Sequence, residues 1–490
     1  MSAVGSSPFL PPAKPGRVHT STVIERDTII SCRNSQGAEI QATPVRLNRF
    51  AAVFEVYNPY SILQLSEVLL DFRISIGERL VYSGRAVVSN LVNAGIMLVC
   101  EAALEESWLD VDLFSPLTEP DQLRNELSGF MREAAKIHAV SPEFKIVVAD
   151  MHSMFTDLRR WLEQVELGLR SLPTNDLLRR EQEIITEIGP PVGPAFNELF
   201  VRFETIAGAV DISAHAMHRT YMRRLLHPLV LCAPFAYRTF QKPLGYAGDY
   251  LMVNMILSRA LEGGSLFAKA VHAWFLTQAP AEAHRNRIAY LRRQIVAETT
   301  RAVAAGRRLR IFNLGCGPAG EVQQCLAEEP VCDAADFTLV DFNDETLEFS
   351  QEKLTALKQQ HQRATGLTFQ RKSVHQILKE SARIDPSAPQ YDLVYCAGLF
   401  DYLSDRICQR LVNIFYDMLA PGGLLIVTNV DSCNPARNGM EFLLEWHLIH
   451  RDREQLKRLH PLAAPPGAVT TQADVTGVNI YLEVRKPGIA

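Results

Sequence analysis

The chain has 490 residues, of which 47% are hydrophobic and 21% are charged, and its formal net charge is −5. This length indicates roughly two to four domains. The composition excludes a largely disordered chain, and the weak net charge argues against a surface for polyanions, so nucleic acid is not expected as a partner.

Residues 1–17 are rich in proline and predict a disordered leader. This segment lacks the basic start and apolar core of a signal peptide, and no apolar run is long enough to span a bilayer. The nine cysteines contain no CxxC pair and no zinc-like spacing, so no metal site is predicted. We therefore expect a cytoplasmic protein with free thiols and without stable membrane insertion.

Short alternating runs at residues 18–23, 49–56, 84–89 and 95–99 predict a small β-barrel or sandwich over residues 18–110. The piece from Asn90 to Gly95 resembles the second signature of PilZ domains, which implies a PilZ-like fold. Val92 stands where that family has a serine, and its double-arginine segment is represented only by Arg46 and Arg49 at a different spacing. We do not expect cyclic di-GMP binding, and the alternative for Asn90 and Gly95 is a tight turn.

Helical periodicity follows, and it predicts a helical bundle over residues 121–295. Apolar stripes recur at three-to-four spacing around Phe155 and again around Phe196, which is typical of core packing. The proline-rich segment 189–194 is expected to separate two of these helices. The bundle would serve as a scaffold or as a cap that recognises the substrate.

The segment from Lys242 to Tyr250 has two glycines, two tyrosines and an aspartate within its last six residues. Such a composition suits neither a helix nor a strand, so it predicts a loop of specified shape. One interpretation is a rigid turn that joins the bundle to the next domain. The other is a cap that places Tyr246, Asp249 and Tyr250 at an active site.

An apolar strand at residues 310–314 leads into a loop with Gly315, Gly317 and Gly320, and a second strand ends at Asp341. Glycines at these positions allow a tight turn and a close approach to a ligand, and the acid suits both hydroxyls of a ribose. Further strands follow at residues 391–396, 419–428 and 478–484. We predict an α/β Rossmann-like domain over residues 296–490.

This order of strands and loops resembles the class I S-adenosylmethionine (SAM) methyltransferases, and the alternatives are a dehydrogenase or a nucleotide fold without activity. The position before the glycine loop, often acidic in that family, is Asn313 here. The resemblance implies SAM as the cofactor. It also implies that the following residues bind SAM: Asn313, Leu314, Gly315, Cys316, Gly317, Gly320, Asp341, Phe342, Ser373, Val374, Cys396, Ala397 and Gly398.

Nearly the whole chain resembles bacterial proteins described as participating in 3-hydroxypalmitic acid methyl ester biosynthesis, through the loop at 242–250 and segments such as Glu445 to Arg451. The resemblance implies a fatty-acid carboxylate as methyl acceptor and a methyl ester signal, as in quorum sensing, as product. A carboxylate needs no general base, whereas a hydroxyl or amine needs one. The candidate catalytic residues are Tyr246, Asp249, Tyr250, Tyr402 and His447, with His375 and Asp401 as further candidate bases, and His447 alternatively a structural residue.

Other functions stay open at this point. The acceptor could be another metabolite, an amine or a protein side chain, and the chain could be a nucleotide-responsive signalling protein with a SAM-binding fold. A homodimer is also left open.

Overall fold

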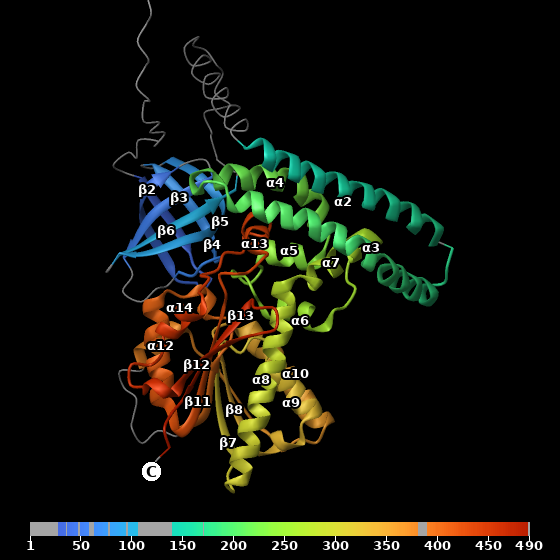
Figure 1. Ribbon diagram of the computed structural model, residues 1–490. Helices are drawn as coiled ribbons and strands as arrows, with labels where there is room; N and C mark the ends of the chain where they lie inside the picture. The colour runs from blue at the N-terminus through green and yellow to red at the C-terminus, as the bar shows by residue number, and fades with distance from the viewer. Residues whose placement is uncertain are drawn as a thin grey trace, which may run out of the picture.

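The computed structural model describes residues 28–35, 37–47, 50–57, 63–76, 79–94, 97–105, 140–169, 171–380 and 390–488. An N-terminal β-barrel, a helical region and a domain built on a mixed sheet follow one another along the chain (Figure 1). The predicted fold class is confirmed in all three parts. The predicted leader, residues 1–17, lies outside the described residues.

The barrel closes in the order β1-β2-β3-β6-β5-β4. Alternate residues of its strands point inward, so Phe54, Phe72 and Tyr82 are fully buried at its centre, with ring centroids about 6 Å apart. The strands are β1 Thr28–Arg33, β2 Glu39–Leu47, β3 Ala51–Tyr57, β4 Val68–Ile76, β5 Arg79–Ala94 and β6 Met97–Leu104.

One detail of the predicted barrel is corrected, and others lie outside the described residues. Asn90 is not in a tight turn: it lies within β5, opposite Glu101 of β6, because this hairpin extends to residue 94 before the chain turns. The predicted strand at residues 18–23, and also Arg49 and Gly95, lie outside the described residues.

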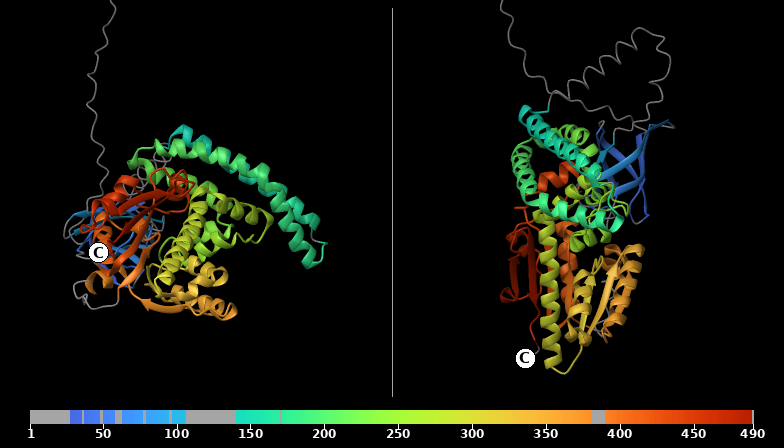
Figure 2. Two further views of the ribbon diagram at one scale, coloured as in Figure 1. Left: turned by 60° about the horizontal axis from the view of Figure 1, so that its bottom comes forward. Right: turned by 90° about the vertical axis from the view of Figure 1, so that its right-hand side faces the viewer.

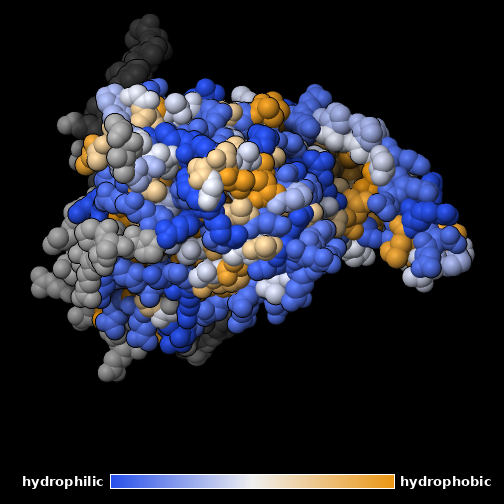
Figure 3. Space-filling view, turned by 90° about the horizontal axis from the view of Figure 1, so that it is seen from below, coloured by the Kyte–Doolittle hydropathy of each residue, from blue (hydrophilic) through white to orange (hydrophobic). Residues whose placement is uncertain are grey.

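The helical region begins with a long hairpin, α2 (Pro142–Leu169) and α3 (Thr174–Gly208), whose far end projects from the body (Figure 2). A hollow with hydrophobic residues lies between this end and the rest of the molecule (Figure 3). The remaining helices are η2 Ile212–Ala214, α4 His215–Val230, α5 Pro234–Gln241, α6 Tyr250–Ser258, α7 Leu266–Thr277 and α8 Ala279–Ala304. The predicted boundary at residues 295 and 296 falls inside α8.

The segment 189–194 does not separate two helices, because α3 runs through Pro190, Pro191 and Pro194 without a break. All three prolines are exposed, so water can satisfy the carbonyls that lose their helical partners. Phe196, after the prolines, is buried against Phe155 of α2 at a ring distance of 4.6 Å. Tertiary packing on both sides of the prolines thus outweighs the loss of the helical hydrogen bonds that proline cannot donate.

The C-terminal domain has a seven-stranded sheet in the order β12-β13-β11-β10-β7-β8-β9, in which β13 alone runs antiparallel to the other strands. Its strands are β7 Leu309–Leu314, β8 Ala335–Asp341, β9 Gly366–Arg371, β10 Tyr391–Cys396, β11 Leu419–Val430, β12 Val469–Ala473 and β13 Asn479–Arg485. Its helices are α9 Gly320–Glu328, η3 Pro330–Ala334, α10 Asp344–Gln360, α11 Val374–Glu380, η5 Phe400–Tyr402, α12 Asp405–Met418, α13 Arg437–Leu443, α14 Arg453–Arg458 and η6 Pro466–Ala468.

Helix α13 leaves this domain and enters the helical region, where it lies between the barrel and the hairpin (Figure 1). Phe442 is fully buried there, with its ring 5.9 Å from Phe144 of α2 and 6.0 Å from Phe203 of α3. The late part of the chain therefore completes the core of the bundle. None of the helices in the described ranges combines the length and apolarity needed to cross a membrane.

Candidate active site

A cavity of about 460 Å³ lies where the carboxyl ends of the parallel strands meet the helical region. This is the position where open α/β sheets bind their ligands. One part of the cavity is lined by the glycine loop and by the ends of β8 and β10, and the other part by helices α3, α5, α6 and α7 together with residues 434–448. The site is thus built jointly by two parts of the molecule.

The glycine loop follows β7 directly and turns through positive φ at Gly315 (+69°) and Gly317 (+52°), a conformation that favours glycine. A Cβ on Gly317 would meet no atom within 4 Å, so the space beside it is open to a ligand. Gly320, at the start of α9, faces α6: a Cβ there would lie 2.7 Å from Cδ1 of Leu257.

Asp341 ends β8 and lines the cavity beside this loop. Its Oδ2 accepts a hydrogen bond from the Gly317 amide at 3.1 Å, and its Oδ1 accepts one from the Asn343 amide at 3.1 Å. The side chain is nearly buried, and this burial raises the pKa of Asp341. The two amides orient a carboxylate whose remaining lone pairs can accept hydrogen bonds from a ligand.

Asn313, which replaces the usual acid before the glycine loop, shares a buried cluster with Glu321. Its Nδ2 donates to Glu321 Oε1 at 3.4 Å, and the Tyr395 hydroxyl donates to the same oxygen at 2.7 Å. Asn313 Oδ1 has no partner in the structure although it is buried. Glu321 lines the cavity, so the carboxylate absent at position 313 is provided by the first turn of α9.

Most of the residues predicted to bind SAM line this one cavity: Asn313, Leu314, Gly315, Cys316, Gly317, Gly320, Asp341, Phe342, Val374, Ala397 and Gly398. Two of the predicted residues are not among its lining residues. Cys396 is fully buried in the core beneath the sheet edge, and Ser373 accepts a hydrogen bond from the Gln376 amide at the start of α11.

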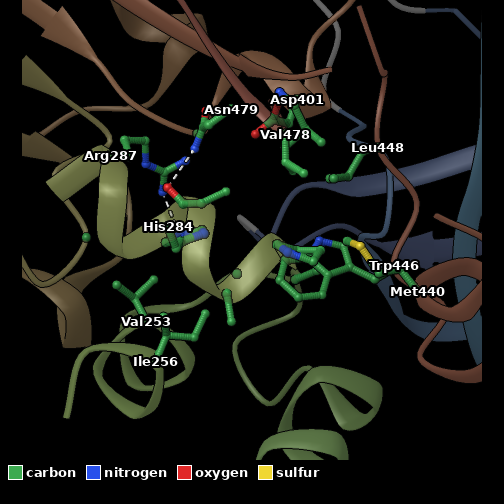
Figure 4. A pocket seen from close by; sticks show the side chains of 18 of the residues that line it. Val253, Ile256, His284, Arg287, Asp401, Met440, Trp446, Leu448, Val478 and Asn479 are labelled. Carbon is green, nitrogen blue, oxygen red and sulfur yellow. Dashed lines mark hydrogen bonds between the residues drawn. The ribbon is translucent and has the colours of Figure 1, made fainter. Parts of the chain in front are cut away.

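Arg287 of α8 also lines the cavity and was not predicted. It is 6% exposed, and no carboxylate of the described residues forms a salt bridge with it. Its Nη2 lies 2.6 Å from Nε2 of His284, and burial lowers the pKa of His284 well below its usual range, so the ring is a neutral acceptor (Figure 4). Arg287 Nε and Asn479 Oδ1 have no partner. A buried guanidinium without a carboxylate indicates a site for an anionic ligand group.

The loop from Gly245 to Tyr250 forms a wall of the cavity. Tyr246, Ala247, Gly248 and Tyr250 line it, and a Cβ on Gly248 would lie 3.0 Å from the hydroxyl of Tyr402. The ring of Tyr246 packs 5.2 Å from that of Phe342, and its hydroxyl lies 3.5 Å from Oγ1 of Thr346. Burial raises the pKa of Tyr246, so the hydroxyl stays protonated at neutral pH.

The other candidate catalytic residues have different surroundings. Asp249 caps α6, because it accepts hydrogen bonds from the Met252 amide (2.9 Å) and from Arg238 Nε (2.8 Å). The Tyr250 hydroxyl donates to Glu345 at 2.8 Å. His447 is buried outside the lining residues, 3.4 Å from Arg219.

Among the candidate bases, Asp401 lines the cavity, whereas His375 and His447 do not. Asp401 Oδ1 accepts a hydrogen bond from the Val430 amide at 2.6 Å, and burial raises the pKa of Asp401 to about 6. Tyr402 also lines the cavity, and its hydroxyl accepts a hydrogen bond from Trp446 Nε1 at 2.9 Å.

The second part of the cavity, which we call the apolar chamber, was not predicted. Figure 4 shows Val253 and Ile256 on one side of it and Met440, Trp446 and Leu448 on another. Periodicity cannot separate chamber residues from core residues, because both are apolar. The chamber is lined by Phe200, Val201, Phe235, Val253, Ile256, Trp274, Phe275, Met440, Leu443, Leu444, Trp446 and Leu448.

Among the described residues, no three histidine, cysteine, aspartate or glutamate side chains are grouped so that they could hold a metal ion. Further polar residues also line the cavity: Gln64, Asn197, Glu204, Thr277, Gln278, Lys372 and Asn434.

The sheet, its glycine loop and the acid after β8 define a nucleotide-binding α/β domain of the class I methyltransferase type. In agreement, residues 312–425 match a protein-family model described as a methyltransferase domain. The fold and this match together identify this part of the chain as a class I methyltransferase domain, for which the predicted cofactor is SAM. No curated protein gives a significant match.

Several solved structures are similar at low sequence identity. A possible exported protein from Bordetella parapertussis is 18% identical, with a TM-score of 0.39, over 60% of this chain and 97% of that chain. Magnesium protoporphyrin IX methyltransferase from Synechocystis PCC 6803, with bound SAH, is 12% identical (TM-score 0.30; 43% and 88% covered). The N-methyltransferase NodS from Bradyrhizobium japonicum WM9 is 16% identical (TM-score 0.29; 51% and 99% covered). Scores this low carry no information about substrate.

Proposed function

We propose that the protein transfers a methyl group from SAM to the carboxylate of an apolar acid, with a 3-hydroxy fatty acid as the preferred acceptor and a methyl ester as product. The observation that supports this acceptor is the continuity of the cavity: the nucleotide part opens directly into the apolar chamber. A chamber with these walls favours an alkyl chain over a polar metabolite.

The residues around the nucleotide part fit SAM. Asp341 accepts hydrogen bonds from the ribose, the space beside Gly317 admits the methionine end, and Arg287 pairs with the methionine carboxylate. Asn313 Oδ1 and Glu321 accept hydrogen bonds from the ammonium group. SAM supplies the methyl group from a sulfonium and leaves as S-adenosylhomocysteine.

The protein's own contribution to the reaction is orientation and exclusion of water. A carboxylate is already ionised at neutral pH, so the site has no proton to remove from it. Tyr246, Gly248 and Tyr402 close one side of the cavity, and the apolar chamber holds the alkyl chain so that the carboxylate is directed toward the nucleotide part. Removal of water from the carboxylate raises its reactivity.

The test is methyl transfer with isotopically labelled SAM. The protein is incubated with straight-chain acids, 3-hydroxy acids, and the alcohols and amines of the same chain lengths, and products are identified by mass spectrometry. We expect label in the methyl esters of the longer acids, and more of it with the 3-hydroxy acids. Label only in an alcohol, an amine or a protein side chain would contradict the proposed acceptor.

Arg287→Gln tests the cofactor part of the proposal. Loss of a charge-assisted hydrogen bond should weaken SAM binding by about 1.5–3 kcal/mol, measured by calorimetry. Arg293→Gln, on the same helix, is the matched control with expected wild-type affinity. Unchanged SAM affinity in Arg287→Gln would contradict the proposed pairing of this guanidinium with the carboxylate of SAM.

A further inference from the structure

The β-barrel contacts two walls of the cavity, mainly through one short segment, residues 63–68, which we call the barrel loop. Gln64 of this loop lines the cavity itself. Ser66 is fully buried and has a φ of +60°, an uncommon conformation for a residue other than glycine. A strained, buried loop at this place indicates a specified contact rather than a simple connection.

The first wall is the segment 443–448, which we call the strap. Leu443, Leu444, Trp446 and Leu448 line the cavity, whereas Glu445 and His447 do not and instead contact the barrel and the bundle. Ser66 Oγ accepts a hydrogen bond from the His447 amide, donates to the His447 carbonyl at 2.9 Å and lies 3.3 Å from the Glu445 carbonyl. One barrel side chain thus binds the strap backbone on both sides of Trp446.

Glu445 ties the same strap to two further parts of the molecule. Its carboxylate pairs with Arg85 of β5 at 2.6 Å and with Arg223 of α4. Lys242 Nζ, at the end of α5, donates to the Leu444 carbonyl at 3.2 Å. Burial alone would raise the pKa of Glu445, but Arg223, Arg85 and Lys242 together hold it well below its usual range.

The second wall is the loop from Gly245 to Tyr250, which we call the cavity loop. The Val68 amide donates to the Gly245 carbonyl at 2.6 Å. A Cβ on Gly245 would lie 2.8 Å from Cβ of Ser35, so the loop is pressed against the barrel. Ser35 is in turn held by its amide, which donates to the buried carboxylate of Glu67 at 2.7 Å.

We infer that the barrel sets the shape of the acceptor site, and that Ser66 and Arg85 are positioning residues for acceptor specificity. They act through the strap and the cavity loop, without touching the acceptor. This role does not require the barrel to bind a nucleotide. The inference rests on the proposed function for the identity of the acceptor, but the contacts that carry it do not depend on that identity.

The kinetic test uses Ser66→Ala and Arg85→Lys in the full-length protein. Alanine has the same difficulty as serine at positive φ, so Ser66→Ala removes only the hydroxyl, and lysine keeps the charge of Arg85 but not its fork of donors. We expect the KM for long-chain acids to rise at least fivefold and the preference between long and short chains to shrink. The Kd for SAM and the kcat at saturating acceptor should stay within twofold.

The matched controls are Ser31→Ala, on the outer face of β1, and Arg73→Gln, exposed on β4. Both should leave the KM and the chain-length profile unchanged. A uniform loss of kcat, SAM binding and stability in Ser66→Ala would reduce the residue to a structural one and overturn the inference.

A second readout separates this inference from the proposed function. Amide hydrogen exchange of Ser66→Ala is compared with wild type in the absence of acceptor. We expect exchange to become at least tenfold faster in residues 443–449 and 245–250, and to stay unchanged in the nucleotide part at 309–345. Unchanged exchange in both walls would overturn the inference even if acids are methylated, and faster exchange would support it even if the acceptor proves to be of another class.

Discussion

Asp341 offers the sharpest test at the scale of single residues. Asp341→Ala removes the acceptor proposed for the ribose hydroxyls, and SAM binding should weaken by about 1.5–3 kcal/mol, the range for hydrogen bonds to a charged group. Calorimetry measures the change. Asp336→Ala is the control, since Asp336 lies on the same strand but pairs with Arg308 at the exposed opposite end. Wild-type affinity in Asp341→Ala would contradict the assigned cofactor site.

Asp401 distinguishes the two classes of nucleophile by pH. Its carboxyl has a raised pKa of about 6 and lines the cavity, so it could serve as a base only in its ionised form. If the acceptor were a hydroxyl or an amine, kcat/KM would rise as the pH increases through about 6. A carboxylate acceptor is already ionised at that pH, so in that case we expect kcat/KM to show no rise through about pH 6, and Asp401→Asn should retain turnover within severalfold.

The sequence allowed prediction of some of these residues and not others. Asp341 and Gly317 are contiguous with strands whose pattern is strong, so local periodicity was enough to place them. Arg287 is one of several arginines on α8, and only the packing of that helix against the sheet leaves this one buried without a carboxylate. Glu321 takes over from the missing acid at position 313 through a tertiary contact that has no sequence signal.

At the scale of elements, the loop from Gly245 to Tyr250 contains two residues with separable roles. Tyr246 faces the cavity, and its hydroxyl has only a 3.5 Å contact to Thr346. Tyr246→Phe should therefore lower kcat about tenfold, or about 1.4 kcal/mol of transition-state stabilisation, while the melting temperature stays unchanged. Normal turnover in this variant would assign the loop a purely structural role.

Asp249→Asn should show the opposite behaviour. The asparagine can still cap α6, but the buried ion pair with Arg238 is lost, and breaking such a pair costs about 3–5 kcal/mol. We expect the lower end of this range, because the Arg238 side chain keeps 16% exposure to solvent. Denaturant unfolding measures the loss, and a drop in turnover without any loss of stability would return Asp249 to the catalytic candidates.

The shapes of the elements were predictable where local signals and tertiary packing agree. The strands of the C-terminal sheet and the loop at 242–250 meet this condition. Helix α3 does not, because Pro190 and its neighbours indicate a break that the packing of Phe196 overrides. The composition of the cavity loop indicated a specified shape, but which of its side chains face the cavity depends on α6 and the barrel.

At the scale of the whole molecule, Glu445→Gln tests the junction of barrel, bundle and strap. Removing this carboxylate leaves Arg223 without its partner carboxylate and leaves Arg85 with the longer contact to Glu105 at 3.6 Å, so the free energy of unfolding at pH 7 should fall by about 3–5 kcal/mol. Because the folded-state pKa is depressed, this contribution is complete above about pH 4.5 and is lost as the pH falls through the folded-state value. Urea unfolding at several pH values measures both effects.

The matched control is Glu441→Gln. Glu441 lies on α13, four residues before Glu445, and pairs with the half-exposed Arg437 at an i,i+4 spacing. Such a pair should contribute about 0.3–0.5 kcal/mol. Equal losses in the two variants would mean that the junction does not hold the three parts together. No sequence pattern indicated this junction, since Ser66, Arg85, Arg223 and Glu445 are far apart along the chain and belong to no shared motif.

The placement of α13 also has a consequence for the order in which the chain can mature during translation. Residues of α2 and α3 leave the ribosome long before Phe442, which packs between Phe144 and Phe203. Until then the nascent bundle exposes an unfilled apolar groove, and Arg85 of the barrel, which is made earlier still, lacks its 2.6 Å ion pair with Glu445. Synthesis must therefore proceed past Glu445 before either of the earlier parts reaches its final packing, which makes the unfinished chain a natural client for chaperones that shield apolar surface.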